Sequence, residues 1–188
     1  EDENKYLGQT IQIVPHITNK ILERINLVSL ESEITLIEVG GTCGDMESDC
    51  FLDAIRQLKQ KNWDDVLIVL LAPVLWINVI KEFKTKLAQN SVRELQGYGL
   101  QPDILLCRCD REIPGKILDK IANLTNIPRC AIFDAPDVKS IYQVPIEFYN
   151  RQIDDLIVDK FKLKRNGCRI NKYRDLVEKY MDTELPEI

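Results

Sequence analysis

Three carboxylates and three glycines gather in residues 38–48, directly after an apolar segment that suits a buried strand. Glycines let backbone N–H groups come close to a ligand. A carboxylate at the end of such a strand commonly holds Mg²⁺ beside a nucleotide phosphate, and Glu38 is the candidate for that role. Asp45 and Glu47 would serve equally well as caps of a following helix. The spacing alone leaves both interpretations open.

A second group combines Lys84, Lys86 and the amide of Gln89 just before a helix expected over residues 90–98. Cations at a helix N-terminus suit an anion such as a phosphate, because charge-assisted hydrogen bonds add to the helix dipole. The alternative is a pair of solvated surface lysines. A third polar group follows the apolar residues 103–107 and comprises Arg108, Asp110, Arg111 and Lys120.

Composition excludes several classes of protein. The chain has 188 residues, with 25 Lys plus Arg against 30 Asp plus Glu and a net charge of −5, which argues against a nucleic-acid or anionic-membrane partner. Seven basic residues lie in residues 160–174, but without interleaved aromatics a solvated connector is favoured. No apolar run reaches the roughly 18 to 20 residues of a membrane span. Six scattered cysteines without zinc spacing indicate reduced thiols and a cytoplasmic protein.

The elements that must position these groups alternate along the chain. Apolar segments predict strands at residues 10–14, 33–39, 66–72, 103–107 and 129–133. Amphipathic spacing predicts helices after Pro15, over residues 51–58 and 90–98, after Pro114, over 146–161, and in a last segment from about Tyr173. This alternation predicts an α/β fold, a mostly parallel sheet with helices on both faces. Ligands of such sheets bind beyond the carboxyl ends of the strands.

Six collinear blocks of the sequence resemble the N-terminal amidoligase (synthetase) domain of CTP synthase. They are YLGQTIQIVPHIT (6–18), IEVGGTCGDMES (37–48), FLDAIRQ (51–57), KTKLAQNSVREL (84–95), QPDILLCRCDREIP (101–114) and DVKSIYQVP (137–145). The resemblance implies a P-loop-NTPase or dethiobiotin-synthetase-like fold. It divides the chain into a partial amidoligase domain over residues 1–164 and a linker with a C-terminal helix over 165–188.

The family makes CTP from UTP, ATP and glutamine: ATP phosphorylates the uracil O4, and ammonia from a glutaminase domain displaces the phosphate. The resemblance implies that Glu38 is a Mg²⁺ ligand, while the catalytic residues stay unassigned. The UTP or CTP contacts that it implies are Asp45, Met46, Glu47, Lys84, Lys86, Gln89 and Lys120. Because neighbouring subunits share these contacts in the family, a homotetramer is the expected assembly.

Three departures restrict the expected activity of this chain. No GxxxxGK occurs, so the first strand and phosphate loop that cradle ATP are expected to be missing. The glutaminase domain is also expected to be missing, and residues 72–83 differ from the family's approach to the Lys-Thr-Lys motif. We therefore expect part of a CTP synthase that is inactive alone. The alternatives are a catalytically incomplete CTP- or UTP-binding or assembly module, and a different amidoligase or dethiobiotin-synthetase-like ATPase.

Overall fold

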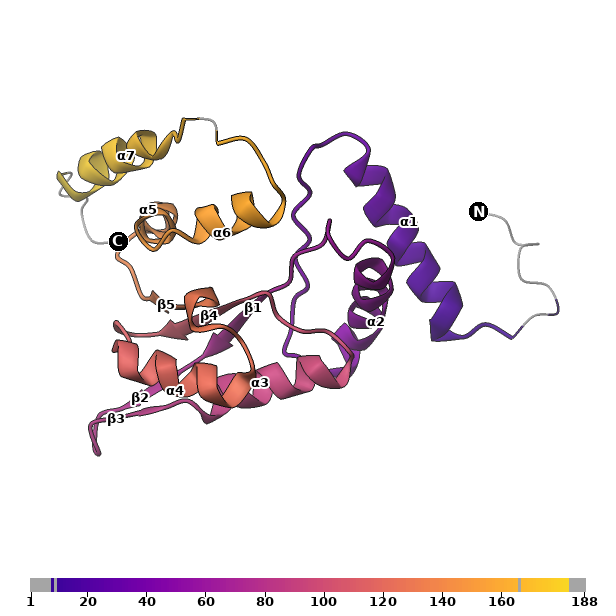
Figure 1. Cartoon of the computed structure of the whole chain (residues 1–188), viewed down its shortest axis with the longest axis horizontal. Coiled ribbons are helices and arrows are strands. Elements are labelled where there is room, and N and C mark those ends of the chain that lie inside the picture. Colours follow the sequence, from indigo (N-terminus) through magenta and orange to yellow (C-terminus); the bar gives the residue numbers. More distant parts are fainter. Residues whose placement is uncertain (1–7, 9, 166, 183–188) are drawn as a thin grey trace, which may run out of the picture. The chain divides into compact units, whose positions relative to one another are not determined.

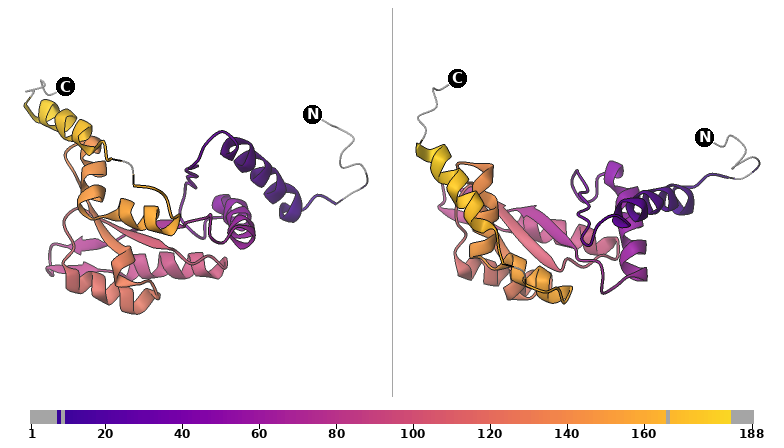
Figure 2. Two further views of the ribbon diagram at one scale, coloured as in Figure 1. Left: turned by 45° about the horizontal axis from the view of Figure 1, so that its top comes forward. Right: turned by 90° about the horizontal axis from the view of Figure 1, so that it is seen from above.

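The computed structural model describes residues 8, 10–165 and 167–182, with side chains to Tyr180, and the chain forms two compact units (Figure 1). Unit 1 comprises Glu1–Val66 and Arg93–Gln101, and unit 2 comprises Leu67–Val92 and Pro102–Ile188. Figure 2 shows the same elements from two further directions. Each unit is described by itself.

Unit 2 is built on a three-stranded parallel sheet. Its strands are β1 (Val69–Pro73), β4 (Ile104–Cys109) and β5 (Ile132–Pro136), in the order β1-β4-β5. Both neighbouring pairs are parallel, which confirms the predicted α/β class. In β4 five of the six residues are buried, because helices cover both faces of the sheet (Figure 1).

Helices on the two faces supply the cores of unit 2. Helix α4 (Gly115–Thr125) buries Leu118 and Ile121 on one side of the sheet. On the other side, α5 (Val144–Asn150) and α6 (Ile153–Lys160) pack on a cluster of Ile104, Leu106 and Ala135. The single helix predicted over residues 146–161 was wrong, because Gln152 adopts a φ of 58° and interrupts it.

The C-terminal part of the described chain is helix α7 (Ile170–Asp182), which contacts α5 and the 3₁₀ turn Ile141–Gln143. The Arg174 guanidinium lies 5.9 Å from the centre of the Tyr149 ring, a cation–π contact between α7 and α5. The predicted C-terminal helix is therefore confirmed. The domain boundary after residue 164 stays a prediction.

Two features of unit 2 between β1 and β4 differ from expectation. A short antiparallel hairpin, β2 (Leu75–Ile77) with β3 (Glu82–Lys84), was not predicted. Helix α3 runs Lys86–Gly97, so the predicted start at Asn90 was wrong. The backbone N–H of Gln89 donates to the Thr85 carbonyl at 3.1 Å, which closes a helical turn four residues earlier.

Strand β5 also begins later than predicted, because residues 129–131 form a 3₁₀ turn.

Unit 1 contains α1 (Thr18–Ser29) and α2 (Met46–Lys61), preceded by a helical turn at Ile13–Ile17. The strands predicted at residues 10–14 and 33–39 were both wrong: in the described part of this unit neither segment is a strand. In the second of them Leu36 is 95% exposed. An extended apolar segment becomes a strand only when a neighbour pairs with its backbone groups, and periodicity does not supply that neighbour.

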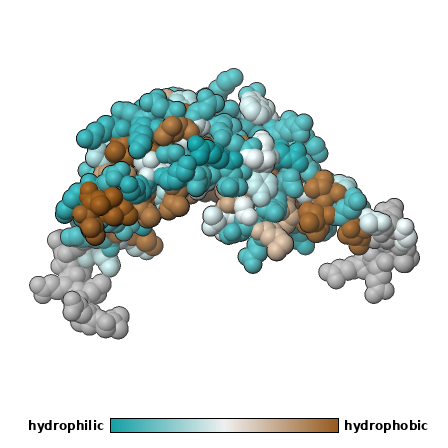
Figure 3. All heavy atoms as spheres, turned by 90° about the horizontal axis from the view of Figure 1, so that it is seen from below, coloured by the Kyte–Doolittle hydropathy of each residue, from teal (hydrophilic) through white to brown (hydrophobic). Residues whose placement is uncertain are grey.

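Across residues 8, 10–165 and 167–182, no helix combines the length and the apolar character that crossing a membrane requires. Figure 3 shows one face of the molecule, mostly hydrophilic with separate apolar patches.

A partly buried ion network joins β5 to the end of α5. The Arg151 guanidinium donates to both oxygens of Asp134, at 2.9 and 3.2 Å, and to Glu147. The Arg151 and Asp134 side chains are only 17% and 15% exposed. Burial alone would raise the pKa of the Asp134 carboxyl, but the hydrogen bonds and charge of Arg151 outweigh it and hold this pKa below its ordinary value.

We expect Arg151→Ala to lower the free energy of unfolding by about 3 kcal/mol, because it leaves the Asp134 carboxylate partly desolvated without its cationic partner. Arg165→Ala is the matched control, since Arg165 also pairs with two carboxylates, those of Asp155 and Asp159, but is 56% exposed. Its loss should be less than about 1 kcal/mol. Urea unfolding at neutral pH measures both values, and an Arg151→Ala loss as small as that expected for the control would show that the buried network does not stabilise unit 2.

Candidate functional site

The two lysines of the predicted anion group flank a buried threonine in unit 2. Lys84 ends β3 and Lys86 begins α3, and both are exposed, whereas Thr85 between them is 4% exposed. The amide of Gln89 donates to the Thr85 hydroxyl at 2.9 Å, and Gln89 is itself only 7% exposed. This buried bond fixes the turn from which the two ammonium groups project. Gln89, predicted to contact nucleotide, is therefore part of the support of this turn, and its nucleotide contact stays a prediction.

Glu82 interacts with two of the predicted cations, Lys84 and Lys120. The Lys84 ammonium lies 2.8 Å from the Glu82 carboxylate, because residues two apart on a strand share one side. The hydrogen bond and the charge of Lys84 lower the pKa of Glu82, and Lys120 on α4 contributes in the same direction. The charges of Lys84 and Lys120 therefore both lower the pKa of this carboxylate. Sequence reasoning missed Glu82, although its spacing from Lys84 would have indicated the pair once a strand was assigned there.

The third predicted group separates into two ion pairs at the carboxyl edge of the sheet. Arg108 lies 2.6 Å from the Asp137 carboxylate and donates to the Pro136 carbonyl at 3.1 Å. Arg111 pairs with Asp110 at 2.9 Å, and its guanidinium lies over the ring of Trp76 at 4.8 Å. Lys120 belongs to α4, and its charge helps to lower the pKa of Glu82.

In unit 1 the predicted pyrimidine contacts begin helix α2. Asp45 precedes the helix with extended backbone, and its carboxylate accepts the Thr42 N–H at 3.2 Å. The buried Ser48 hydroxyl lies 2.9 Å from the Asp45 carbonyl and 3.2 Å from the Thr42 carbonyl. Met46 is 87% exposed and Glu47 is also exposed. The loop is thus fixed by its own hydrogen bonds, and the side chains of Met46 and Glu47 are open to solvent.

The end of α3 supports this loop from within unit 1. Tyr98 donates its phenolic hydrogen to the Asp49 carboxylate, across 49 residues of sequence. Gly44 has a φ of 95°, and a Cβ there would lie 3.4 Å from a Glu94 carboxylate oxygen. Burial raises the pKa of the neighbouring Cys43 thiol, and the charge of Glu94 adds to that shift. Tyr98 and Glu94 carry no motif of their own, so sequence reasoning missed them.

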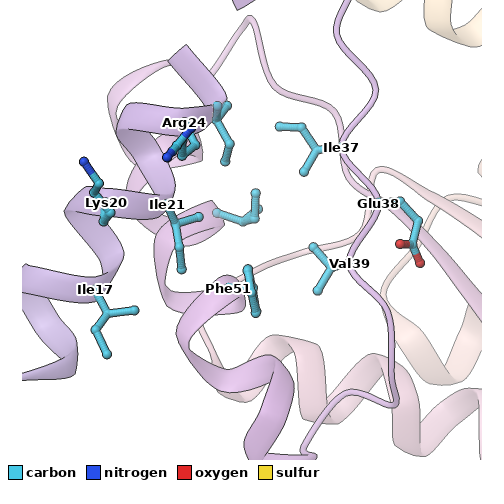
Figure 4. Close-up of a pocket in the computed structure, with 10 residues that line it drawn as sticks. Ile17, Lys20, Ile21, Arg24, Ile37, Glu38, Val39 and Phe51 are labelled. Atoms are coloured by element: carbon cyan, nitrogen blue, oxygen red, sulfur yellow. The ribbon is translucent and has the colours of Figure 1, made fainter. Parts of the chain in front are cut away.

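Glu38 lies beside an apolar hollow of about 380 Å³ in unit 1. In Figure 4, Ile37 and Val39 point toward the helices, whereas the Glu38 carboxylate points to the opposite side. Six isoleucines and valines with Phe51 make this hollow apolar: Ile17, Ile21, Ile25, Ile37, Val39 and Ile55. The Glu38 carboxylate therefore does not face the apolar space.

A magnesium ion at Glu38 would need ligands besides protein carboxylates. A Cβ at Gly40 would lie 3.7 Å from a Glu38 oxygen, so glycine leaves space beside the carboxylate. Among the described residues, no three His, Cys, Asp or Glu side chains converge as a metal cage. This donor set fits Mg²⁺ shared with phosphates and water, which is how proteins commonly hold it.

Comparison with known proteins agrees with the resemblance. A family model described as "CTP synthase N-terminus" matches residues 1–163. The CTP synthase of Acidobacterium capsulatum is 41% identical over 180 residues, which is 95% of this chain and 33% of that protein. Those of Methanococcus maripaludis and Aquifex aeolicus are each 39% identical, over 97% and 94% of this chain and 34% of each relative. The chain spans about one third of the length of these curated relatives.

The bond between Tyr98 and Asp49 predicts an unusual alkaline titration. The hydrogen bond to Asp49 is the main cause that raises the pKa of Tyr98 from 10.0 to about 12. Because the folded-state pKa is the higher one, this stabilisation is complete below about pH 10 and is lost between about pH 10 and pH 12. Phenolate absorbance of wild type should therefore show one late-titrating tyrosine.

Asp49→Asn tests this assignment, because it removes the charge but keeps the side-chain size. The late tyrosine should move toward the ordinary value near 10. Tyr98→Phe should abolish the late step altogether. A late step that persists in both variants would assign it to another tyrosine and contradict the contact.

Proposed function

Because the chain belongs to the CTP synthase N-terminus family, we propose that it binds a pyrimidine nucleoside triphosphate as part of an enzyme that makes CTP. The observation that carries the proposal is the exposed pair Lys84 and Lys86, fixed by the buried bond between Gln89 and Thr85. Two ammonium groups held on one rigid turn can contact neighbouring phosphates without first losing backbone freedom.

The triphosphate takes the place of Glu82 in this proposal. Lys84 already holds a carboxylate at 2.8 Å, and the charge of Lys120 acts on the same carboxylate. A phosphate oxygen presents the same charge and the same acceptor to these ammonium groups. Each charge-assisted hydrogen bond contributes about 1.5 to 3 kcal/mol, less the cost of breaking the exposed pair with Glu82. Two or three such bonds suffice for micromolar binding together with base and ribose contacts.

The loop that begins α2 supplies the other contacts. Asp45, Met46 and Glu47 bind the pyrimidine and ribose, since Met46 and Glu47 are exposed and the loop is held by Ser48. Glu38 holds Mg²⁺ jointly with phosphate oxygens. When bound, Mg²⁺ neutralises phosphate charge and orients the transferring phosphoryl group. In a homotetramer these contacts come from more than one copy of the chain.

The reaction of the whole enzyme extends the proposal beyond this segment. ATP phosphorylates O4 of UTP, and ammonia released from glutamine by a glutaminase domain displaces that phosphate to give CTP. Phosphoryl transfer depends almost wholly on positioning and charge stabilisation around ATP. Because no GxxxxGK occurs in the 188 residues, we propose that this chain alone is inactive and acts in the cytoplasm with a complete ATP cradle and a glutaminase domain.

Calorimetry of the full chain with CTP, UTP, ATP and cytidine tests the proposed function. CTP and UTP should bind at least about tenfold more tightly than ATP, and cytidine should bind weakly because it lacks the phosphates. A flat CTP titration in the presence of Mg²⁺ would overturn the proposal. Tighter binding of ATP than of CTP would favour an ATPase of related fold instead.

Lys84→Ala should weaken CTP binding by about tenfold or more and leave cytidine binding nearly unchanged, since one phosphate contact is lost. Lys81→Asn is the matched control: Lys81 lies on the same hairpin, and asparagine tolerates its φ of 52°. That variant should bind CTP like wild type. Equal losses of CTP and cytidine affinity in Lys84→Ala would reject the phosphate assignment.

Glu38→Gln should abolish the increase in CTP affinity that Mg²⁺ produces, because an amide cannot replace an anionic ligand of a hard cation. Titrations with and without Mg²⁺ measure this difference. Glu33→Gln, an exposed carboxylate five residues earlier in the sequence, should keep the full effect of Mg²⁺. An unchanged Mg²⁺ effect in Glu38→Gln would remove this residue from the metal site.

A further inference from the structure

Trp76 is the packed side chain of the β2–β3 hairpin. It faces Phe83 across the two strands, with ring centres 4.7 Å apart and planes inclined by 59°. Its indole N–H donates to the Asn78 side chain at 2.8 Å. Near the tip, Val79 and Ile80 are 91% and 52% exposed, whereas Trp76 is half-buried. The described contacts that fix the hairpin therefore concentrate at the Trp76 ring.

Arg111 joins this ring to a different segment of unit 2. Its guanidinium lies 4.8 Å from the centre of the Trp76 ring, close enough for a cation–π contact. Two hydrogen bonds to the Asp110 carboxylate, at 3.0 and 2.9 Å, fix the orientation of the guanidinium. Arg111 belongs to the loop between β4 and α4, so Trp76 bridges the hairpin and that loop.

The two bridged segments carry the cations of the proposed phosphate site. Phe83 directly precedes Lys84, and the loop of Arg111 leads into α4, which carries Lys120. Two strands of three residues are too short to be stable as an isolated hairpin. The position of Lys84 relative to Lys120 thus depends on what the hairpin packs against.

We propose that Trp76 is a positioning residue of the phosphate site: packed between Phe83 and Arg111, it fixes the β2–β3 hairpin and so holds the Lys84 ammonium in place for a phosphate. This inference rests on the proposed function. Trp76 acts through Lys84 and does not itself contact the nucleotide. Its removal therefore loosens the lysine without removing any charge.

A double-mutant cycle measured by CTP calorimetry on the full chain tests the inference. Trp76→Ala should weaken CTP binding about tenfold, and Trp76→Phe should recover affinity to within about threefold of wild type, because phenylalanine retains an aromatic face for Arg111. In a Lys84→Ala background, Trp76→Ala should have no further effect. A merely structural role would give additive losses in the double variant.

Two further variants complete the test. Trp63→Ala is the matched control, because Trp63 also lies beside a cation, Lys59 at 4.9 Å, but belongs to unit 1, and CTP affinity should not change. Arg111→Gln removes the cation and leaves Trp76 in place, so it reports on the bridge even when Trp76→Ala does not fold. It should weaken CTP binding severalfold, with cytidine binding and the circular dichroism spectrum unchanged.

The outcomes separate this inference from the proposed function. When Lys84→Ala weakens CTP binding but Trp76→Ala and Arg111→Gln do not, the positioning role is overturned and the phosphate site stands. Additive losses in the double variant overturn it as well. When Lys84→Ala itself leaves CTP affinity unchanged, the phosphate assignment fails, and the role of Trp76 fails with it.

Discussion

The parallel pairing of β4 with strands on both sides is the constraint on which the rest of unit 2 depends. Its register sets Pro73 of β1 opposite Arg108, and Arg108 opposite Ala135 of β5. The carboxyl ends of the three strands therefore lie along one edge. The hairpin with Lys84, the Arg111 loop and the segment that begins at Asp137 all leave the sheet at that edge. A buried apolar strand thus determines where the polar groups emerge.

A strand needs both a suitable apolar pattern and a neighbouring strand to pair with, and the sequence shows only the first. The strand near residues 103–107 was predictable, because burial on both faces requires nearly continuous apolar residues. The strand near residues 66–72 is equally apolar and was predicted too, although Val69 and Leu71 are 46% and 60% exposed. The segment 33–39 has a similar apolar pattern but is not a strand, since a strand also requires a paired neighbour. The β2–β3 hairpin was missed because three residues per strand are too few to show alternation.

For the candidate site, residue types were more predictable than side-chain directions. The exposure of the two lysines could be predicted from their charge. The burial of Gln89 could not, because a glutamine side chain can be either solvated or buried in a hydrogen bond. The ion pair of Glu82 with Lys84 could not be predicted until residues 82–84 were known to form a strand. The contact of Tyr98 with Asp49 spans 49 residues and depends on tertiary structure, so neither residue type nor spacing could indicate it.

In both units a buried polar side chain orders a segment that carries exposed polar groups. Ser48 fixes the loop of unit 1 and Gln89 fixes the lysine turn of unit 2, each through a hydrogen bond from a buried side chain. Such supports reduce the entropy lost when a ligand binds, which matters for side chains as mobile as lysine. The two units therefore use the same means, a buried polar residue that orders an exposed loop.

Hydrogen exchange of the full chain with and without CTP and Mg²⁺ shows directly whether the nucleotide orders the lysine turn and the loop that begins α2. The account predicts slower exchange of backbone amides in residues 82–92 and 42–49, and unchanged exchange in α7 (Ile170–Asp182). Slower exchange confined to other segments, while CTP binds, would contradict it.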